Sequence, residues 1–84
     1  MSKIHVRGIE MGYDEAGSGT PVVLLHGYPF NRTMWGEQIE ALMPRHRILA
    51  PDLRGHGETT AVSGPVTMEE MAHDVSALME KLNI

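Results

Sequence analysis

The chain has 84 residues, which is enough for one small domain. Its formal net charge is −4 at pH 7 and its seven Lys and Arg residues are scattered, so a surface for nucleic acid or for an anionic membrane is disfavoured. The absence of cysteine excludes a disulfide framework. Since neither a signal peptide nor a membrane-spanning run is recognisable, we expect a cytoplasmic location.

Apolar and polar residues alternate through two short runs near the start of the chain, on either side of Gly8. The alternating apolar residues are Ile4, Val6, Ile9, Met11 and Tyr13. A period of two residues is typical of a strand with one buried face. The two runs therefore predict a β-hairpin whose apolar side faces the core.

The next elements are continuously apolar or helical in spacing. Val22–Leu25 is short and begins with β-branched residues, which is typical of a strand covered on both faces in a parallel sheet. Apolar residues then follow at helical spacing from Trp35 through Ile39 to Leu42 and Met43. Because proline cannot continue a helix, we expect this helix to end before Pro44.

A second apolar strand, Arg47–Pro51, leads through a glycine-rich loop to a helix that we expect over Met68–Leu82. Thr67 and Glu70 have the spacing of a capping box at its start. A hairpin followed by strand, helix, strand and helix is typical of an α/β fold. Since another parallel strand should follow such a helix, we expect residues 1–84 to be one part of a larger sheet. A complete small α/β domain is the alternative.

The segment His26-Gly27-Tyr28-Pro29 directly follows the first apolar strand. A strand that ends in this way leaves backbone N–H groups exposed at the carboxyl edge of the sheet, where ligands bind in open α/β folds. An N–H without a ladder partner can donate to an anion. A plain strand-to-helix turn explains the same residues, so this motif alone leaves both interpretations open.

The loop after the second apolar strand contains Asp52, Arg54, Gly55, His56 and Gly57. We expect Asp52 and Arg54 to form an ion pair and His56 to bridge backbone groups. Neither arrangement is catalytic, and a single histidine in a glycine-rich loop is more often structural than a general base. We therefore interpret these five residues as a structural loop.

Together the two motifs, in this order and spacing, resemble the α/β-hydrolase superfamily, and they resemble the N-terminal part of its doubly wound sheet. The resemblance covers nearly the whole chain, through residues 12–19, 22–29, 34–35, 47–57 and 68–82. It implies that the backbone N–H of Tyr28, the residue after His-Gly, is one donor of an oxyanion hole. It also implies that His26, Gly27 and Pro29 border the substrate pocket.

The family places a Gly-x-Ser-x-Gly elbow, an acid and a histidine after these motifs. No elbow is present, and none of the four serines stands in a recognisable nucleophile–base arrangement: Ser2, Ser18, Ser63 and Ser76. We therefore expect the chain to be inert alone, and its parent enzyme to hydrolyse an ester or lactone with a triad beyond Ile84. Epoxide hydrolases and dehalogenases share His-Gly-x-Pro and use Asp, so the nucleophile of the parent can be Ser or Asp.

Two hypotheses from other classes remain beside the enzyme fragment. The chain can be a truncated or engineered piece that self-assembles, or a small-ligand binding domain that uses the same loops. The histidines show no metal-ligand spacing, and we expect neither metal nor cofactor. Because Val22–Leu25 would leave an open, uncharged sheet edge, we expect the partner to be a second copy or the missing C-terminal half of the hydrolase, and we do not expect a folded monomer.

Overall fold

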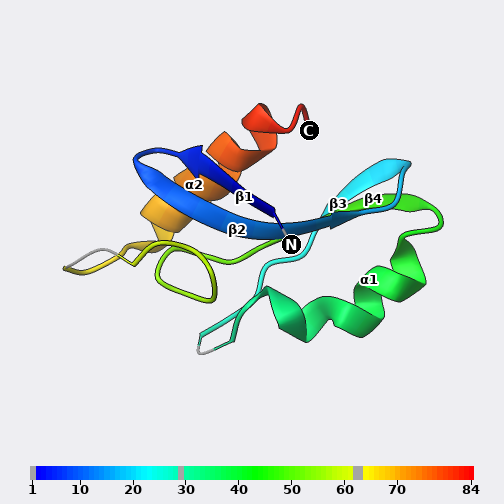
Figure 1. The fold of residues 1–84 in the computed structure, drawn as a ribbon, viewed down its shortest axis with the longest axis horizontal. Helices are drawn as coiled ribbons and strands as arrows, with labels where there is room; N and C mark the ends of the chain where they lie inside the picture. Colours follow the sequence, from blue (N-terminus) through cyan, green and yellow to red (C-terminus); the bar gives the residue numbers. More distant parts are fainter. Residues whose placement is uncertain (1, 29, 62–63) are drawn as a thin grey trace.

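The computed structural model describes residues 2–28, 30–61 and 64–84, and within them a mixed four-stranded sheet has the order β1-β2-β4-β3. One helix lies on each face of this sheet, α2 above it and α1 below it in the view of Figure 1. The strands are β1 (Ser2–Val6), β2 (Ile9–Ala16), β3 (Thr20–Val23) and β4 (His46–Pro51). The helices are the 3₁₀ turn η1 (Arg32–Trp35), α1 (Gly36–Leu42) and α2 (Met68–Lys81).

The predicted hairpin is present as β1 and β2, which pair antiparallel from Val6 opposite Ile9. Its two turn residues, Arg7 and Gly8, have φ of 48° and 80°. Two successive left-handed residues make the hairpin turn whose twist matches that of the strands. The expectation of one buried face is wrong at Gly12, which is also buried, because its N–H bonds to Thr59 Oγ1 at 3.0 Å in a loop that crosses the opposite face.

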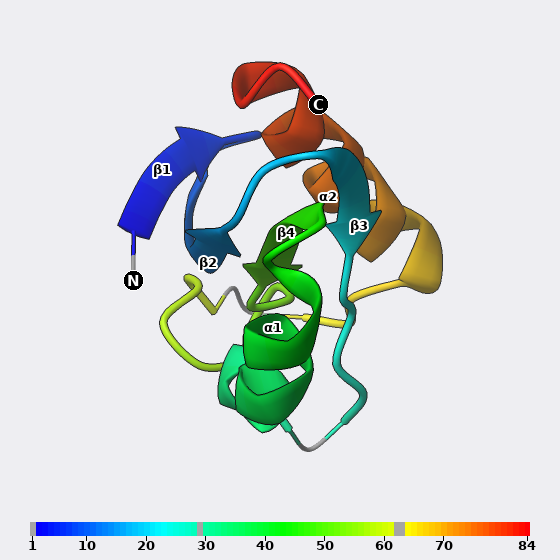
Figure 2. The same cartoon turned by 90° about the vertical axis from the view of Figure 1, so that its right-hand side faces the viewer.

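The two apolar strands pair in parallel as predicted, with Val22 opposite Ile48. The middle of β4 is fully buried because helices cover both faces of the sheet (Figure 2). β3 spans Thr20–Val23, two residues earlier than predicted. Leu24 still donates to the Leu49 carbonyl at 2.9 Å, but Leu25 is half-exposed and lies beyond the end of the strand.

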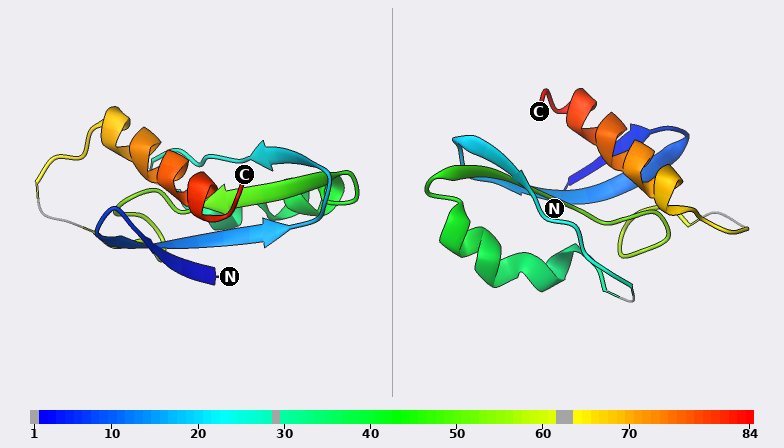
Figure 3. Two further views of the ribbon diagram at one scale, coloured as in Figure 1. Left: turned by 90° about the horizontal axis from the view of Figure 1, so that it is seen from above. Right: turned by 180° about the vertical axis from the view of Figure 1, so that it is seen from behind.

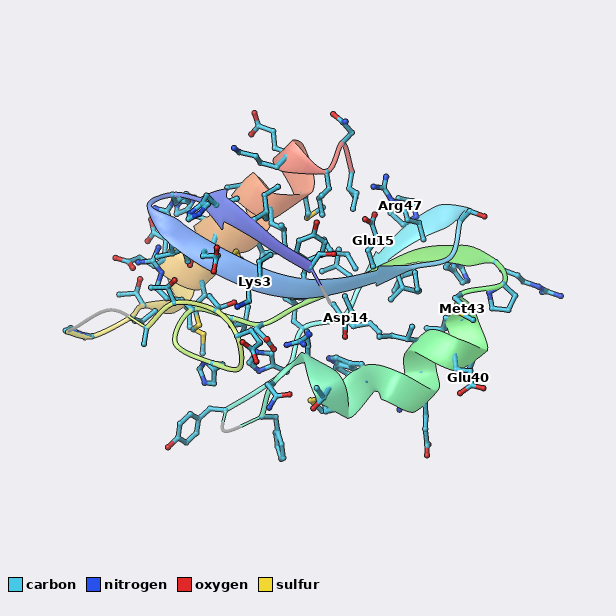
Figure 4. All side chains as sticks on the ribbon, viewed as in Figure 1. Lys3, Asp14, Glu15, Glu40, Met43 and Arg47 are labelled. Atoms are coloured by element: carbon cyan, nitrogen blue, oxygen red, sulfur yellow. The ribbon has the colours of Figure 1, made fainter. Side chains whose placement is uncertain are left out.

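The main core lies between the sheet and α2. Its buried members are Val6, Ile9, Met11, Tyr13, Leu49 and Leu78. The C-terminal end of α2 is also tied to the sheet, because Arg47 on β4 donates to the Leu82 carbonyl at 2.9 Å and to Glu15 on β2 at 2.7 Å. Figure 4 shows Arg47 and Glu15 meeting beside the sheet.

The first helix begins differently from the sequence prediction, whereas α2 begins at Met68 as predicted. The first starts as the 3₁₀ turn η1, where the Asn31 side chain accepts from Thr33 N at 2.9 Å, and α1 then ends before Pro44 as expected. In α2, Thr67 Oγ1 accepts from Glu70 N at 3.0 Å, which is one half of the predicted capping box. The Glu70 carboxylate lies instead 3.3 Å from an Arg54 nitrogen. Among the described helices, none is long and apolar enough to cross a membrane.

Candidate functional site

The two motifs come together at the carboxyl ends of the parallel strands β3 and β4, because both strands leave the sheet at the same end (Figure 3). His26 is the buried link between them: its Nε2 accepts a hydrogen bond from Leu53 N at 2.9 Å. The His26 and His56 ring centroids are 5.0 Å apart, and the Tyr28 ring meets His56 edge-on at 6.0 Å. The sheet therefore places the His-Gly turn beside the glycine-rich loop.

Tyr28 lies outside the strands, and its side chain is 87% exposed. Within the part of the chain that the structure describes, its backbone N–H has no hydrogen-bond partner. Its position at the strand end, next to His56, is the one that the sequence predicts, while its role as an oxyanion donor stays a prediction. Gly27 beside it is exposed, and Pro29 lies outside the described residues.

Asp52 is fully buried at the start of the loop after β4. Its carboxylate accepts from Arg32 N at 2.6 Å and Glu58 N at 2.9 Å, and it pairs with the Arg32 guanidinium. Burial opposes the charge of Arg32, but hydrogen bonds to Asp52 and Asp14 raise the pKa of its guanidinium above the ordinary value. The Asp52–Arg54 pair predicted from sequence is therefore wrong, because a residue of η1 takes the carboxylate.

Arg54 binds the fully buried Asp74 of α2. This helix lies on the opposite face of the sheet from α1 (Figure 1). Two Arg54 nitrogens each lie 2.8 Å from an Asp74 oxygen, and Arg7 adds a third bond at 2.8 Å. The hydrogen bond to Asp74 raises the pKa of Arg54. Sequence reasoning missed Asp74 and Arg32. The signal for Asp74 was present: it is a charged residue beside Val75 and four before Leu78, on the buried side of the helix.

The remaining residues of the loop after β4 determine the shape of that loop. Gly57 has φ of +50°, and a Cβ there would overlap the Asp52 carboxylate, whereas the Cβ position of Gly55, at φ +81°, is open. Thr59 Oγ1 donates to the Asp52 carbonyl at 2.7 Å. His56 Nδ1 lies 3.1 Å from the Arg54 carbonyl, so its side chain contacts one backbone group of the loop, and the predicted bridge between backbone groups stays a prediction. These contacts support a structural role for the loop.

An apolar groove of about 320 Å³ lies between α2 and the strand ends. It is lined by Leu25, Leu53, Met68, Met71, Ala72, Val75, Ser76 and Met79. The apolar stripe of α2 therefore divides, with Leu78 in the core and Met68 80% exposed at the rim. His26, Gly27 and Tyr28 do not line this groove, so it is separate from the substrate pocket that the resemblance implies.

The described residues contain no recognisable nucleophile. Ser2, Ser18 and Ser76 are exposed on β1, in a turn and on α2, and Ser63 lies outside the described residues. Among residues 2–28, 30–61 and 64–84, no group of three His, Asp or Glu side chains is arranged to hold a metal ion. At this edge the backbone N–H of Tyr28 is a hydrogen-bond donor without a partner among the described residues.

A family model described as the alpha/beta hydrolase fold matches residues 20–84, and the chain belongs to this family. It is 36% identical over 78 residues to a non-heme chloroperoxidase of Kitasatospora aureofaciens, covering 92% of this chain and 28% of that protein. It is 40% identical over 77 residues to a soluble epoxide hydrolase of a Corynebacterium strain, covering 92% of this chain and 27% of that protein.

Solved structures agree in fold. A thermophilic esterase from Thermogutta terrifontis matches with a TM-score of 0.93 and 39% identity, over 99% of this chain and 33% of the esterase. An epoxide hydrolase from Vigna radiata matches with a TM-score of 0.92 and 37% identity, over 99% of this chain and 28% of that chain. The resemblance and the α/β class are thus confirmed, and the chain spans about a third or less of the length of these relatives.

Proposed function

We propose that this chain contributes the Tyr28 N–H as one oxyanion-hole donor to an α/β-hydrolase that cleaves a carboxylic ester or lactone. The nucleophile, acid and histidine of that enzyme lie outside these 84 residues. The observation that carries the proposal is the position of Tyr28: its N–H has no partner among the described residues and lies at the carboxyl edge of a parallel sheet, where open α/β folds bind ligands.

A donor at this place acts on charge that develops during the reaction. When a nucleophile attacks an ester carbonyl, the carbonyl oxygen becomes an oxyanion, and a fixed N–H about 2.7–3.1 Å away stabilises it without reorganising. A Ser nucleophile attacks an ester carbonyl, expels the alcohol and forms an acyl-enzyme. An Asp nucleophile, as in epoxide hydrolases and dehalogenases, attacks the carbon of an epoxide or alkyl halide, opens the ring or expels halide, and forms an ester with that carbon. Both intermediates are hydrolysed through an oxyanion, so the same donor serves either enzyme. Because the nucleophile lies outside these 84 residues in this proposal, the chain alone is inert.

A fusion tests this proposal. The 84 residues replace the matched third of the Thermogutta terrifontis esterase, because the two segments share a TM-score of 0.93. We expect the fusion to hydrolyse an activated ester, while the chain alone and the remainder of the esterase alone stay at background. A folded fusion without activity would contradict the proposal, as would saturable hydrolysis by the chain alone that is lost when one serine is replaced.

Self-association is the second candidate, and the free outer edge of β3 favours it. β3 ends the strand order, so in the described fold its outer side has no paired strand. Because the Leu24 N–H points to β4, the backbone N–H groups of the neighbouring odd-numbered residues point away from β4, toward the free edge. Pro21 is one of these residues and has no N–H. The edge is therefore shorter than the sequence predicts, since Pro21 blunts it.

We propose that a second copy pairs with this edge around a two-fold axis and covers the adjoining Met-rich groove. Sedimentation equilibrium at micromolar concentration should give a dimer. Replacing Leu25, which is half-exposed and lines the groove, by lysine should return it toward the monomer, and Met34→Lys on η1, a half-exposed residue that does not line the groove, is the matched control. A single folded species at the monomer mass would contradict self-association.

A further inference from the structure

We infer that His26 is a positioning residue that sets the direction of the Tyr28 N–H; this inference rests on the proposed function. The His26 ring is 4% exposed and sits between the His-Gly turn and the loop after β4. One ring nitrogen, Nε2, accepts from Leu53 N at 2.9 Å, and the other, Nδ1, lies 3.2 Å from the Gly27 carbonyl oxygen.

The Leu53 contact fixes the protonation state of the ring. A backbone N–H can only donate, so Nε2 must be unprotonated and His26 must be neutral. The single ring proton is then on Nδ1, from which it donates to the Gly27 carbonyl. Leu53 itself is held in place, because its own carbonyl accepts from His56 N at 2.9 Å.

The Gly27 carbonyl and the Tyr28 N–H belong to the same peptide group. That group is planar and trans, so its C=O and N–H point in opposite directions. Two donors hold the carbonyl: His26 Nδ1 at 3.2 Å and Phe30 N at 2.7 Å. Holding the carbonyl inward therefore turns the Tyr28 N–H outward. Nothing lies within 4 Å of the position that a Cβ of Gly27 would take, so no packing at this residue fixes the peptide group. We infer that the two hydrogen bonds set its orientation.

The tautomer and two variants test the inference on the chain itself. Long-range ¹H–¹⁵N NMR should show His26 protonated on Nδ1 and not on Nε2. In His26→Leu, which removes both bonds, Leu53 amide exchange should accelerate about tenfold. Residual dipolar couplings should show that the Tyr28 N–H changes direction relative to β4. His26→Gln, whose amide offers one donor and one acceptor, should restore part of both signals.

His56→Leu is the matched control, because His56 packs on His26 but does not contact Leu53 N or the Gly27 carbonyl through its side chain. It should leave the Tyr28 N–H direction unchanged. If His26→Leu fails to fold, His26→Phe, which keeps an aromatic ring beside His56 and removes both hydrogen bonds, replaces it. The same faster Leu53 amide exchange and the same change in the direction of the Tyr28 N–H are expected.

A proton on His26 Nε2, or a Tyr28 N–H that keeps its direction in folded His26→Leu, would overturn the inference. A folded His26→Phe chain in which the Tyr28 N–H keeps its direction would do the same. These readouts concern only the orientation of one peptide group. An inactive esterase fusion with the NMR results intact would contradict the proposed function and leave the positioning role standing.

Discussion

Replacing Gly57 by alanine tests whether the loop after β4 is built around the buried Asp52 carboxylate. Gly57 and Gly55 both have positive φ, but only at Gly57 would a Cβ overlap that carboxylate. Both substitutions carry the cost of a left-handed alanine, about 1–2 kcal/mol. Only Gly57→Ala also displaces Asp52 from Arg32, and breaking a buried ion pair typically costs about 3–5 kcal/mol.

A core of this size supplies only about 3–5 kcal/mol of net stability. We therefore expect Gly57→Ala to be largely unfolded and Gly55→Ala to stay folded with a lower midpoint. Urea unfolding, followed by circular dichroism and by the fluorescence of the single tryptophan, measures both variants at one fixed protein concentration. Equal losses of unfolding free energy in the two variants would refute the reasoning, because the carboxylate contact would then contribute nothing.

Three further substitutions test the contacts of α2. Asp74→Asn should destabilise the chain by about 3–5 kcal/mol in urea unfolding, because it removes the charge of the fully buried carboxylate that Arg54 and Arg7 share. Glu69→Gln on the exposed face should have no effect. The pKa of Arg54 is raised in the folded state, so its contribution to the free energy of unfolding is complete below the pKa of the unfolded state. That contribution is lost only as the pH rises through the pKa of the folded state. The destabilisation in Arg54→Met should therefore be constant from neutral to mildly alkaline pH. Thr67→Ala should cost about 1 kcal/mol in the same assay, because Glu70 N loses its cap, and an unchanged midpoint would contradict that.

Residue periodicity was enough to predict the hairpin, the buried strand β4 and the long helix α2. These elements follow from local patterns, since alternation, an apolar run and a helical stripe each determine which faces are buried. The end of β3 was predicted two residues late, because Leu25 is as apolar as its neighbours but lies past the last ladder bond. Hydropathy alone does not report where a partner strand stops.

The partners of the charged side chains could not be read from the sequence. Asp52 and Arg54 are two residues apart, and proximity predicted a pair, but their real partners lie on opposite faces of the sheet, in η1 and α2. The link from His26 to Leu53 spans 27 residues and depends on the parallel pairing of β3 with β4. The site motifs were therefore recognisable from sequence, while the bonds that orient them required the fold.

The most direct test of the oxyanion role is to remove the Tyr28 N–H alone. In the esterase fusion, Tyr28 is replaced by its α-hydroxy acid analogue, which changes the backbone amide to an ester and keeps the side chain, and kcat for an activated ester is measured. Tyr28→Phe, which keeps the N–H, is the control. The account predicts that kcat falls about 10²–10³-fold with the backbone ester and is unchanged in Tyr28→Phe. An equal kcat for the backbone ester and the unmodified fusion would contradict it.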